Sequence, residues 1–218
     1  QYEDLLTVNR AQSQVMDINH AAGKRAVTVS SPVYSLIKCA KAASMLPDSA
    51  FNLAIGPLVK RWRIGFRGDT VPPMEDIVRL LALTNPEQVL LNDAEQSVYL
   101  TQPGMEIDLG AIAKGYIADR LKDFLVKKGV NSAIINLGGN VLCIGSKPDG
   151  TPFKVGIQKP FADRNETEAV MDITGKSVVS SGIYERCFKQ GGKLYHHILN
   201  PQTGYPYDNG LISVTIIS

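Results

Sequence analysis

The first half of the chain carries apolar residues at helical spacing, and the second half carries short apolar runs typical of strands. Residues 32–47 predict a helix that begins near Pro32 after two serines, a favourable helix start. Residues 72–86 predict a second, shorter helix bracketed by prolines. Residues 89–91 and 97–100 predict the two strands of a hairpin around a polar turn. The apolar face predicted for the first helix comprises Leu36, Ile37, Ala40 and Ala43.

The longest predicted helix starts near Asp108, a typical N-cap residue, and ends at Lys127, Lys128 and Gly129. Its predicted apolar face comprises Ala113, Ile117, Leu121 and Phe124. The rest of the chain predicts strands within residues 132–139, 140–145, 153–160, 169–173, 176–182, 193–200 and 211–218. Helices mostly precede strands, and this order favours a single compact α+β domain, with helices packed on a mainly antiparallel sheet, over a doubly wound parallel sheet.

Composition narrows the class of protein only slightly. The chain has 218 residues and a formal net charge of +2, with its basic residues scattered, which argues against a nucleic-acid partner. Residues 60–68 are the densest basic stretch, interpreted as a solvated turn beside an apolar anchor, Trp62. No apolar run is long enough to span a membrane. The three cysteines lie far apart, without the spacing of a structural zinc site.

Residues 108–115, DLGAIAKG, place small residues at the start of the longest predicted helix. A helix start offers N–H donors and a positive dipole end, which suit a phosphate group. Lys114 adds a positive charge one turn further on, and Gly115 allows close approach of a ligand. The alternative is a tightly packed helix start with a solvated lysine, and the residues alone favour neither interpretation.

A double glycine, Gly138 and Gly139, lies between two of the predicted strands. Glycine permits a positive φ and a close approach of the backbone to a ligand. A plain tight hairpin also explains the pair, and the hairpin is favoured when this motif is taken alone.

Ser180, Ser181 and Gly182 follow an apolar strand and could bind a phosphate or a sugar edge through hydroxyl and backbone donors. The alternative, favoured for this motif alone, is a serine turn leading into a short helix through Tyr184 and Phe188.

Adjacent histidines occur in the strand predicted at residues 193–200. Neighbouring strand residues point to opposite faces, so at most one of His196 and His197 faces a given site. A rigid turn at residues 200–204 follows them, a setting that suits an acid–base or phosphate-binding histidine. A lone histidine is nevertheless more often structural.

In their order and spacing, these motifs resemble the ApbE family, the FAD:protein FMN transferases. The chain carries DLGAIAKGYIADRL, INLGGNV, SVVSSGIYER, HHILNPQTGYP and a closing SVTII strand in the family's order. LTVNRAQSQVMDIN resembles the family's early segment, in which a serine precedes a short run ending in asparagine, and FNLAIGPLVKRW resembles its GPL segment. The resemblance covers nearly the whole chain. It implies a single ApbE-like, T-fold-like domain over residues 1–218, truncated at both ends.

The resemblance also implies a reaction: FAD bound as the substrate, Mg²⁺ at its pyrophosphate, transfer of FMN to a Thr or Ser hydroxyl of a redox protein, and release of AMP. It assigns the backbone carbonyl of Ala111 as one metal ligand and places the remaining ligands beyond Ser218. His197 and Lys114 would be the catalytic residues, and Lys114 would also help to neutralise the charge of the ligand. The residues that the resemblance places along FAD are Asp108, Ala111, Lys114, Gly138, Gly139, Ser180, Ser181, Gly182 and His197.

Two asparagines depart from the family's pattern, because Asn52 and Asn200 stand where aspartate is usual. The motifs alone do not separate a transferase from an FAD-binding protein without transfer activity, or from a pyrophosphatase that gives FMN and AMP. By resemblance only, the protein is expected outside the cytoplasm, attached to a membrane through a lipid anchor that is not in this chain.

Overall fold

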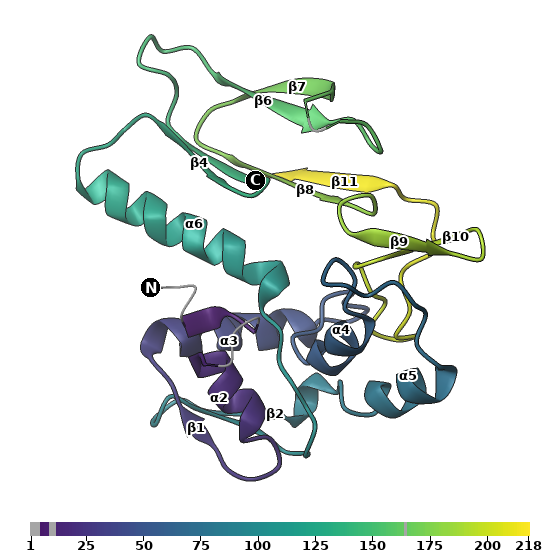
Figure 1. Cartoon of the computed structure of the whole chain (residues 1–218). Helices are drawn as coiled ribbons and strands as arrows, with labels where there is room; N and C mark the ends of the chain where they lie inside the picture. Colours follow the sequence, from purple (N-terminus) through teal and green to yellow (C-terminus); the bar gives the residue numbers. More distant parts are fainter. Residues whose placement is uncertain (1–4, 9–11, 164) are drawn as a thin grey trace. The chain divides into compact units, whose positions relative to one another are not determined.

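The computed structural model describes residues 5–8, 12–163 and 165–218, which fold as two compact units (Figure 1). Unit 1 comprises residues 1–113 and 186–207, and unit 2 comprises residues 114–185 and 208–218. Unit 1 is therefore built from two stretches of chain, with most of unit 2 lying between them in the sequence.

Unit 1 combines short helices with a small sheet and a separate hairpin. Its helices are α2 (Gln14–His20), α3 (Ser31–Ser44), α4 (Gly56–Trp62), α5 (Met74–Leu81) and the 3₁₀ helix η1 (Pro86–Gln88). Its strands are β1 (Val27–Thr28), β2 (Val89–Asn92), β3 (Ser97–Leu100), β9 (Cys187–Gln190) and β10 (Lys193–His196). The sheet has the order β1-β3-β2, and β9 pairs with β10. The two predicted helices are confirmed as α3 and α5, and the predicted hairpin is confirmed as β2–β3.

A hydrogen bond at the start of α3 links this helix to α2. Ser13 is the N-cap of α2, and its Oγ accepts the N–H of Met16 at 2.9 Å. Ser30 is the N-cap of α3, but its hydroxyl donates to the side chain of Gln14 in α2 at 2.9 Å instead of capping its own helix. Helix α3 buries an apolar face close to the predicted one, comprising Val33, Tyr34, Leu36, Ile37 and Ala40.

Trp62, at the end of α4, anchors one core of unit 1 and is only 2% exposed. Its indole N–H donates to the carbonyl of Gly204 at 2.8 Å. Its aromatic neighbours, at centroid distances of 5.7 to 6.4 Å, are Phe188, Tyr195 and Tyr205. The predicted apolar anchor is therefore confirmed. The predicted turn begins later than expected, because Lys60 and Arg61 lie within α4.

Within the described part of unit 2 lie most of α6 (Gly110–Lys127) and six strands. The strands are β4 (Ala133–Leu137), β5 (Asn140–Ile144), β6 (Phe153–Gln158), β7 (Thr167–Ile173), β8 (Ser177–Gly182) and β11 (Ser213–Ile217). Four of them form a sheet of order β11-β8-β5-β4, and β6 pairs with β7. Every pair of named strands in both units is antiparallel, so the α+β class with antiparallel sheets is confirmed.

Helix α6 packs on the four-stranded sheet through a different face from the predicted one. Ala118 and Leu125 contact the sheet, whereas Leu121 is 37% exposed and Phe124 is 58% exposed. The predicted face was wrong at these two positions because apolar residues occur on more than one side of this helix. The predicted helix end is confirmed, since Gly129 has φ +85° and follows directly after the last turn.

The strand predicted within residues 176–182 is confirmed as β8, but it extends further than the interpretation of the two serines assumed. Ser180, Ser181 and Gly182 lie within strand β8 instead of in a turn that follows it. The alternative of a short helix through Tyr184 and Phe188 is wrong, because Phe188 lies in strand β9.

Candidate functional site

Lys114 and the double glycine meet in unit 2. Lys114 projects from α6, and its Nζ donates to the carbonyl of Gly138 at 3.2 Å. Gly138 (φ +59°) and Gly139 (φ +89°) form the turn between β4 and β5, a backbone conformation that side chains other than glycine rarely adopt. The side chain of Asn136 accepts the N–H of Gly139 at 3.0 Å and holds the turn. The hairpin interpretation is thus confirmed. In addition, the ammonium group of Lys114 lies against the carbonyl of the turn.

The serines of β8 lie at the same end of this sheet. Strand β8 runs antiparallel to β5 with Asn140 opposite Val179, so Ser180 is the next residue toward the glycine turn. Ser180 and Ser181 are exposed, and they point to opposite faces because they are successive strand residues. The hydroxyls of Ser180 and Thr215 are 2.8 Å apart. One serine hydroxyl can therefore lie on a given face beside the turn.

Gly182 has a structural reason to be glycine. A Cβ built at this position would lie 2.5 Å from the ring of Tyr184. The residue allows close packing of an aromatic side chain, and the structure gives no separate sign of the ligand contact predicted for it.

The start of α6 is less open than the sequence predicts. Asp108 lies two residues before the helix, so it is not the N-cap, and its Oδ1 accepts the N–H of Gly110 at 2.7 Å. The N–H groups of Ile112 and Ala113 donate to the carbonyl of Leu109. Among the residues that the structure describes, three of the first four N–H groups of α6 have acceptors, and that of Ala111 is left for a ligand. The expectation of several free amide donors at this helix start is therefore wrong.

Asp108 is held in place by two distant segments of unit 1. Its N–H donates to the carbonyl of Leu53 at 2.9 Å. The side chain of Asn19 donates to the carbonyl of Ile107 at 3.1 Å and accepts the N–H of Ile107 at 2.8 Å. Burial raises the pKa of the Asp108 carboxyl; the hydrogen bond from Gly110 opposes this shift and the charge of Glu106 adds to it. The fold thus places a partly desolvated carboxyl beside the start of α6.

The two histidines have different surroundings in unit 1. His196 is 4% exposed; its Nε2 lies 2.9 Å from the carbonyl of Tyr207, and its Nδ1 accepts the N–H of Ile198 at 3.3 Å. Both of its ring nitrogens are therefore used in holding the chain. His197 is half-buried, and its Nδ1 lies 3.3 Å from the carbonyl of Arg186.

The contact between His197 and Arg186 fixes which nitrogen can act as a base. A carbonyl oxygen only accepts hydrogen bonds, so Nδ1 of His197 carries the proton in this contact; in the neutral ring the lone pair is then on Nε2. This arrangement suits a proton acceptor, and it favours His197 over His196 as the residue that can do acid–base chemistry.

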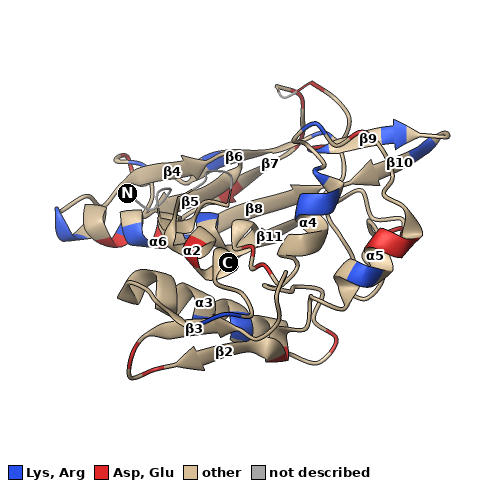
Figure 2. Ribbon diagram, turned by 60° about the horizontal axis from the view of Figure 1, so that its bottom comes forward, with Lys and Arg blue, Asp and Glu red and all other residues tan. Residues whose placement is uncertain are grey.

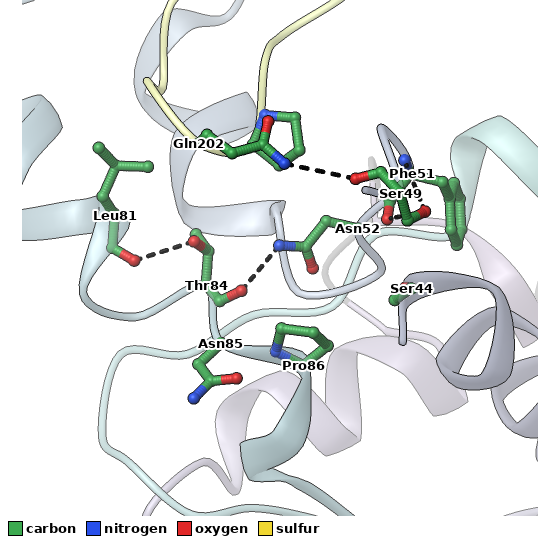
Figure 3. Close-up of a pocket in the computed structure, with 10 residues that line it drawn as sticks. Ser44, Ser49, Phe51, Asn52, Leu81, Thr84, Asn85, Pro86 and Gln202 are labelled. Carbon is green, nitrogen blue, oxygen red and sulfur yellow. Dashed lines mark hydrogen bonds between the residues drawn. The ribbon is translucent and has the colours of Figure 1, made fainter. Parts of the chain in front are cut away.

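A polar pocket of about 260 Å³ lies in unit 1 beside Asn52 (Figure 3). The side chain of Asn52 donates to the carbonyl of Thr84 at 2.8 Å and accepts the N–H of Ala54 at 2.8 Å. A carboxylate could not donate the first of these bonds, which gives a structural reason for asparagine instead of aspartate at this position. On another side of the pocket, Gln202 donates to the carbonyl of Ser49 at 3.4 Å.

Asn200 also acts through neutral hydrogen bonds. Its side chain accepts the N–H of Gln202 at 2.8 Å, and its N–H donates to the carbonyl of Tyr205 at 2.8 Å. Both asparagines that depart from the family's pattern therefore shape the backbone without a charge.

Sequence reasoning missed two positioning groups, Asn19 and the carbonyl of Arg186. The only sequence signal for Asn19 is that it ends the serine-to-asparagine segment, and nothing in the sequence pairs Arg186 with His197. Within the described ranges, no group of three or more His, Cys, Asp or Glu residues could hold a metal ion. No helix in the part of the chain that the structure describes is both long and apolar enough to cross a membrane.

Comparison with known proteins identifies the relatives of this chain. It is 62% identical over 217 residues to an FAD:protein FMN transferase of Klebsiella pneumoniae. This match covers 100% of this chain and 67% of that protein. It is 36% identical over 231 residues to an FAD:protein FMN transferase of Treponema pallidum, covering 100% of this chain and 64% of that protein. The chain spans about two thirds of the length of these relatives.

Solved structures share the fold. The ApbE protein of Thermotoga maritima matches with a TM-score of 0.88 at 37% identity, over 100% of this chain and 69% of that chain. The apo form of the flavinyl transferase ApbE of Pseudomonas stutzeri matches with a TM-score of 0.85 at 30% identity, over 100% of this chain and 67% of that chain. The fold is thus the α+β fold of solved flavin transferases. Residues 1–218 match the ApbE family, and the chain belongs to that family.

Proposed function

We propose that the protein is an FAD:protein FMN transferase. The observation that carries the proposal is the 62% identity, over the whole chain, to a relative with that curated name. In this reaction FMN passes from FAD to a Thr or Ser hydroxyl of an acceptor redox protein, and AMP leaves.

The residues of unit 2 suit a phosphate-bearing substrate. Lys114 offers a cation beside a turn whose Gly139 has open space where a side chain would be. Ser180 or Ser181 adds a hydroxyl at the same end of the sheet. A diphosphate is well bound by a charge-assisted hydrogen bond from a lysine and by backbone groups that can approach its oxygens closely. Because three of the four N–H groups at the start of α6 are already used, Lys114 is proposed as the main cationic contact.

His197 is proposed as the base for the acceptor. Phosphoryl transfer depends chiefly on positioning and on neutralising charge, with a base to orient or deprotonate the nucleophile. In the proposed step the hydroxyl oxygen of the acceptor forms a bond to the phosphorus of the FMN moiety. The pyrophosphate bond to AMP breaks, and the hydroxyl proton passes to Nε2 of His197. The hydrogen bond to the Arg186 carbonyl orients the imidazole ring.

Mg²⁺ dependence is part of the proposal, but the described residues alone do not make a fitting site. The carbonyl of Ala111 is the single predicted ligand in this chain, and it lies within α6, where a helical carbonyl accepts from the residue four positions later. When bound, Mg²⁺ would neutralise charge on the pyrophosphate. The test is loss of activity with a chelator and its recovery with Mg²⁺.

One assay tests the function. The full-length protein is incubated with FAD, Mg²⁺ and an acceptor that carries a threonine, and flavin is followed after denaturation. Fluorescence that stays on the acceptor supports the transferase. Release of free FMN without attachment supports the pyrophosphatase, and unchanged FAD supports a binding protein; either result refutes the proposal. We also propose an extracytoplasmic, lipid-anchored location, which cell fractionation of the full-length protein tests.

A further inference from the structure

The basic stretch of residues 60–68 packs against a second basic segment in unit 1. A Cβ built at Gly65 would lie 2.7 Å from the side chain of Arg186, and the guanidinium of Arg186 lies 5.1 Å from the ring centroid of Phe66. The N–H of Val71 donates at 2.8 Å to the side chain of Gln190, which is 119 residues away in sequence. These contacts form one area, called here the basic surface, comprising Arg63, Arg67, Arg186, Lys189 and Lys193.

The basic surface concentrates positive charge. All five of its basic side chains are exposed, and the only acidic residue in segments 63–71 and 186–193 is Asp69. Its net charge of +4 (five basic residues against one acidic) exceeds the +2 of the whole chain, so the remainder of the chain is net negative. Figure 2 shows basic residues on both strands of the β9–β10 hairpin. The view that basic residues are scattered, taken from the sequence, is therefore wrong for this part of the chain.

Three cations of the basic surface, Arg63, Arg67 and Lys189, are available to a partner. Across the residues that the structure describes, Arg63, Arg67 and Lys189 make no ion pair with an acidic side chain, whereas the nearby Lys60 pairs with Glu106. Phe66 lies among these side chains and is 44% exposed. Arginines around an exposed aromatic ring are characteristic of protein–protein interfaces.

The basic surface adjoins the proposed base. The carbonyl of Arg186 accepts the N–H of His197 at 3.1 Å and also contacts its Nδ1. A macromolecule that docks on the basic surface is thus brought to the residue that would receive the hydroxyl proton of the acceptor.

We propose that the basic surface docks an acidic segment of the acceptor protein, beside the threonine or serine that receives FMN. The choice of occupant rests on the proposed function. A nucleic acid or an anionic membrane would match the charge, but neither explains why the surface adjoins His197. Exposed charges of this kind accelerate encounter and lower the KM for a charged partner, and salt weakens both effects.

The test measures binding without FAD, so its result does not depend on transfer activity. The probes are two labelled threonine peptides of the same length, one flanked by glutamates and the other by glutamines. The full-length protein is compared with its Lys189→Glu/Lys193→Glu variant and with a control, Lys128→Glu/Lys176→Glu. The control makes the same change in net charge at exposed lysines of unit 2.

The wild type and the control should bind the glutamate peptide about tenfold more tightly than the glutamine peptide at low salt, and the Lys189/Lys193 variant should lose that preference. With an acceptor protein, the same variant should raise the KM for the acceptor and leave the KM for FAD unchanged. Equal binding of the two peptides by the wild type overturns the proposal, as does an equal loss in the control. Tighter binding of phosphatidylglycerol vesicles or of a single-stranded oligonucleotide than of the glutamate peptide also overturns it.

Discussion

Replacement of Asn19 should destabilise the protein and disturb the proposed FAD site together. Asn19 is 8% exposed, and its amide makes both a donor and an acceptor bond to the backbone of Ile107, which is 0% exposed. The next residue is Asp108, which leads into α6. In Asn19→Leu, a side chain of similar size leaves one buried N–H and one buried C=O without partners.

The expected loss follows from these two groups. Each unsatisfied buried polar group costs about 1 to 3 kcal/mol, so Asn19→Leu should lower the free energy of unfolding by about 2 to 6 kcal/mol. This is a large part of the stability of a typical domain. Asn131 is exposed, so Asn131→Leu serves as the control and should change stability by less than about 0.5 kcal/mol.

Urea unfolding followed by circular dichroism measures the change, together with FAD affinity by calorimetry. A third variant, Asn19→Asp, keeps the acceptor but can donate to the Ile107 carbonyl only when the new carboxyl is protonated. Its loss of stability should therefore be smaller at about pH 4 than at about pH 8. A loss for Asn19→Leu no larger than that of Asn131→Leu would refute the reasoning, because the two backbone groups would then have other partners.

Three further predictions concern the candidate site. Because burial raises the pKa of Asp108, the protonated carboxyl contributes stability at low pH, and this contribution is lost as the pH rises through the folded-state pKa. In Asp108→Asn, the free energy of unfolding in urea should no longer show this loss with rising pH. Lys114→Gln should weaken FAD binding about tenfold by calorimetry, and Lys127→Gln on the same helix should not. His197→Ala should lower the rate of transfer about 100-fold or more with little change in stability, whereas His196→Ala should lower the free energy of unfolding by about 1 to 3 kcal/mol.

Local sequence signals predicted most of the elements. The spacing of apolar residues placed α3, α5 and the β2–β3 hairpin, and Gly129 marked the end of α6. Such signals depend on residues close together in the chain, so they can be recognised without the fold. Gly138 and Gly139 likewise marked a turn whose positive φ angles only glycine readily adopts.

The face that a helix buries depends on what packs against it. Helix α6 carries apolar residues on more than one side. Ala118 and Leu125 pack against the sheet, whereas Phe124 is exposed. The hydrophobic effect is not directional, so an apolar pattern on several sides does not decide which stripe meets the sheet. The expectation of free N–H donors at the start of α6 was wrong for a similar reason. The Asp108 side chain and the Leu109 carbonyl accept hydrogen bonds from most of these N–H groups.

By itself, the sequence determined the α+β class, the antiparallel strands and the order of motifs that resembles the ApbE family. Only the tertiary structure decided that Asn19 holds Ile107, that the Arg186 carbonyl fixes the ring of His197, and that two distant basic segments form one surface. Each of these contacts joins groups that no periodicity relates. A hydrogen bond or a concentration of charge depends on distances in space, and the fold sets those distances.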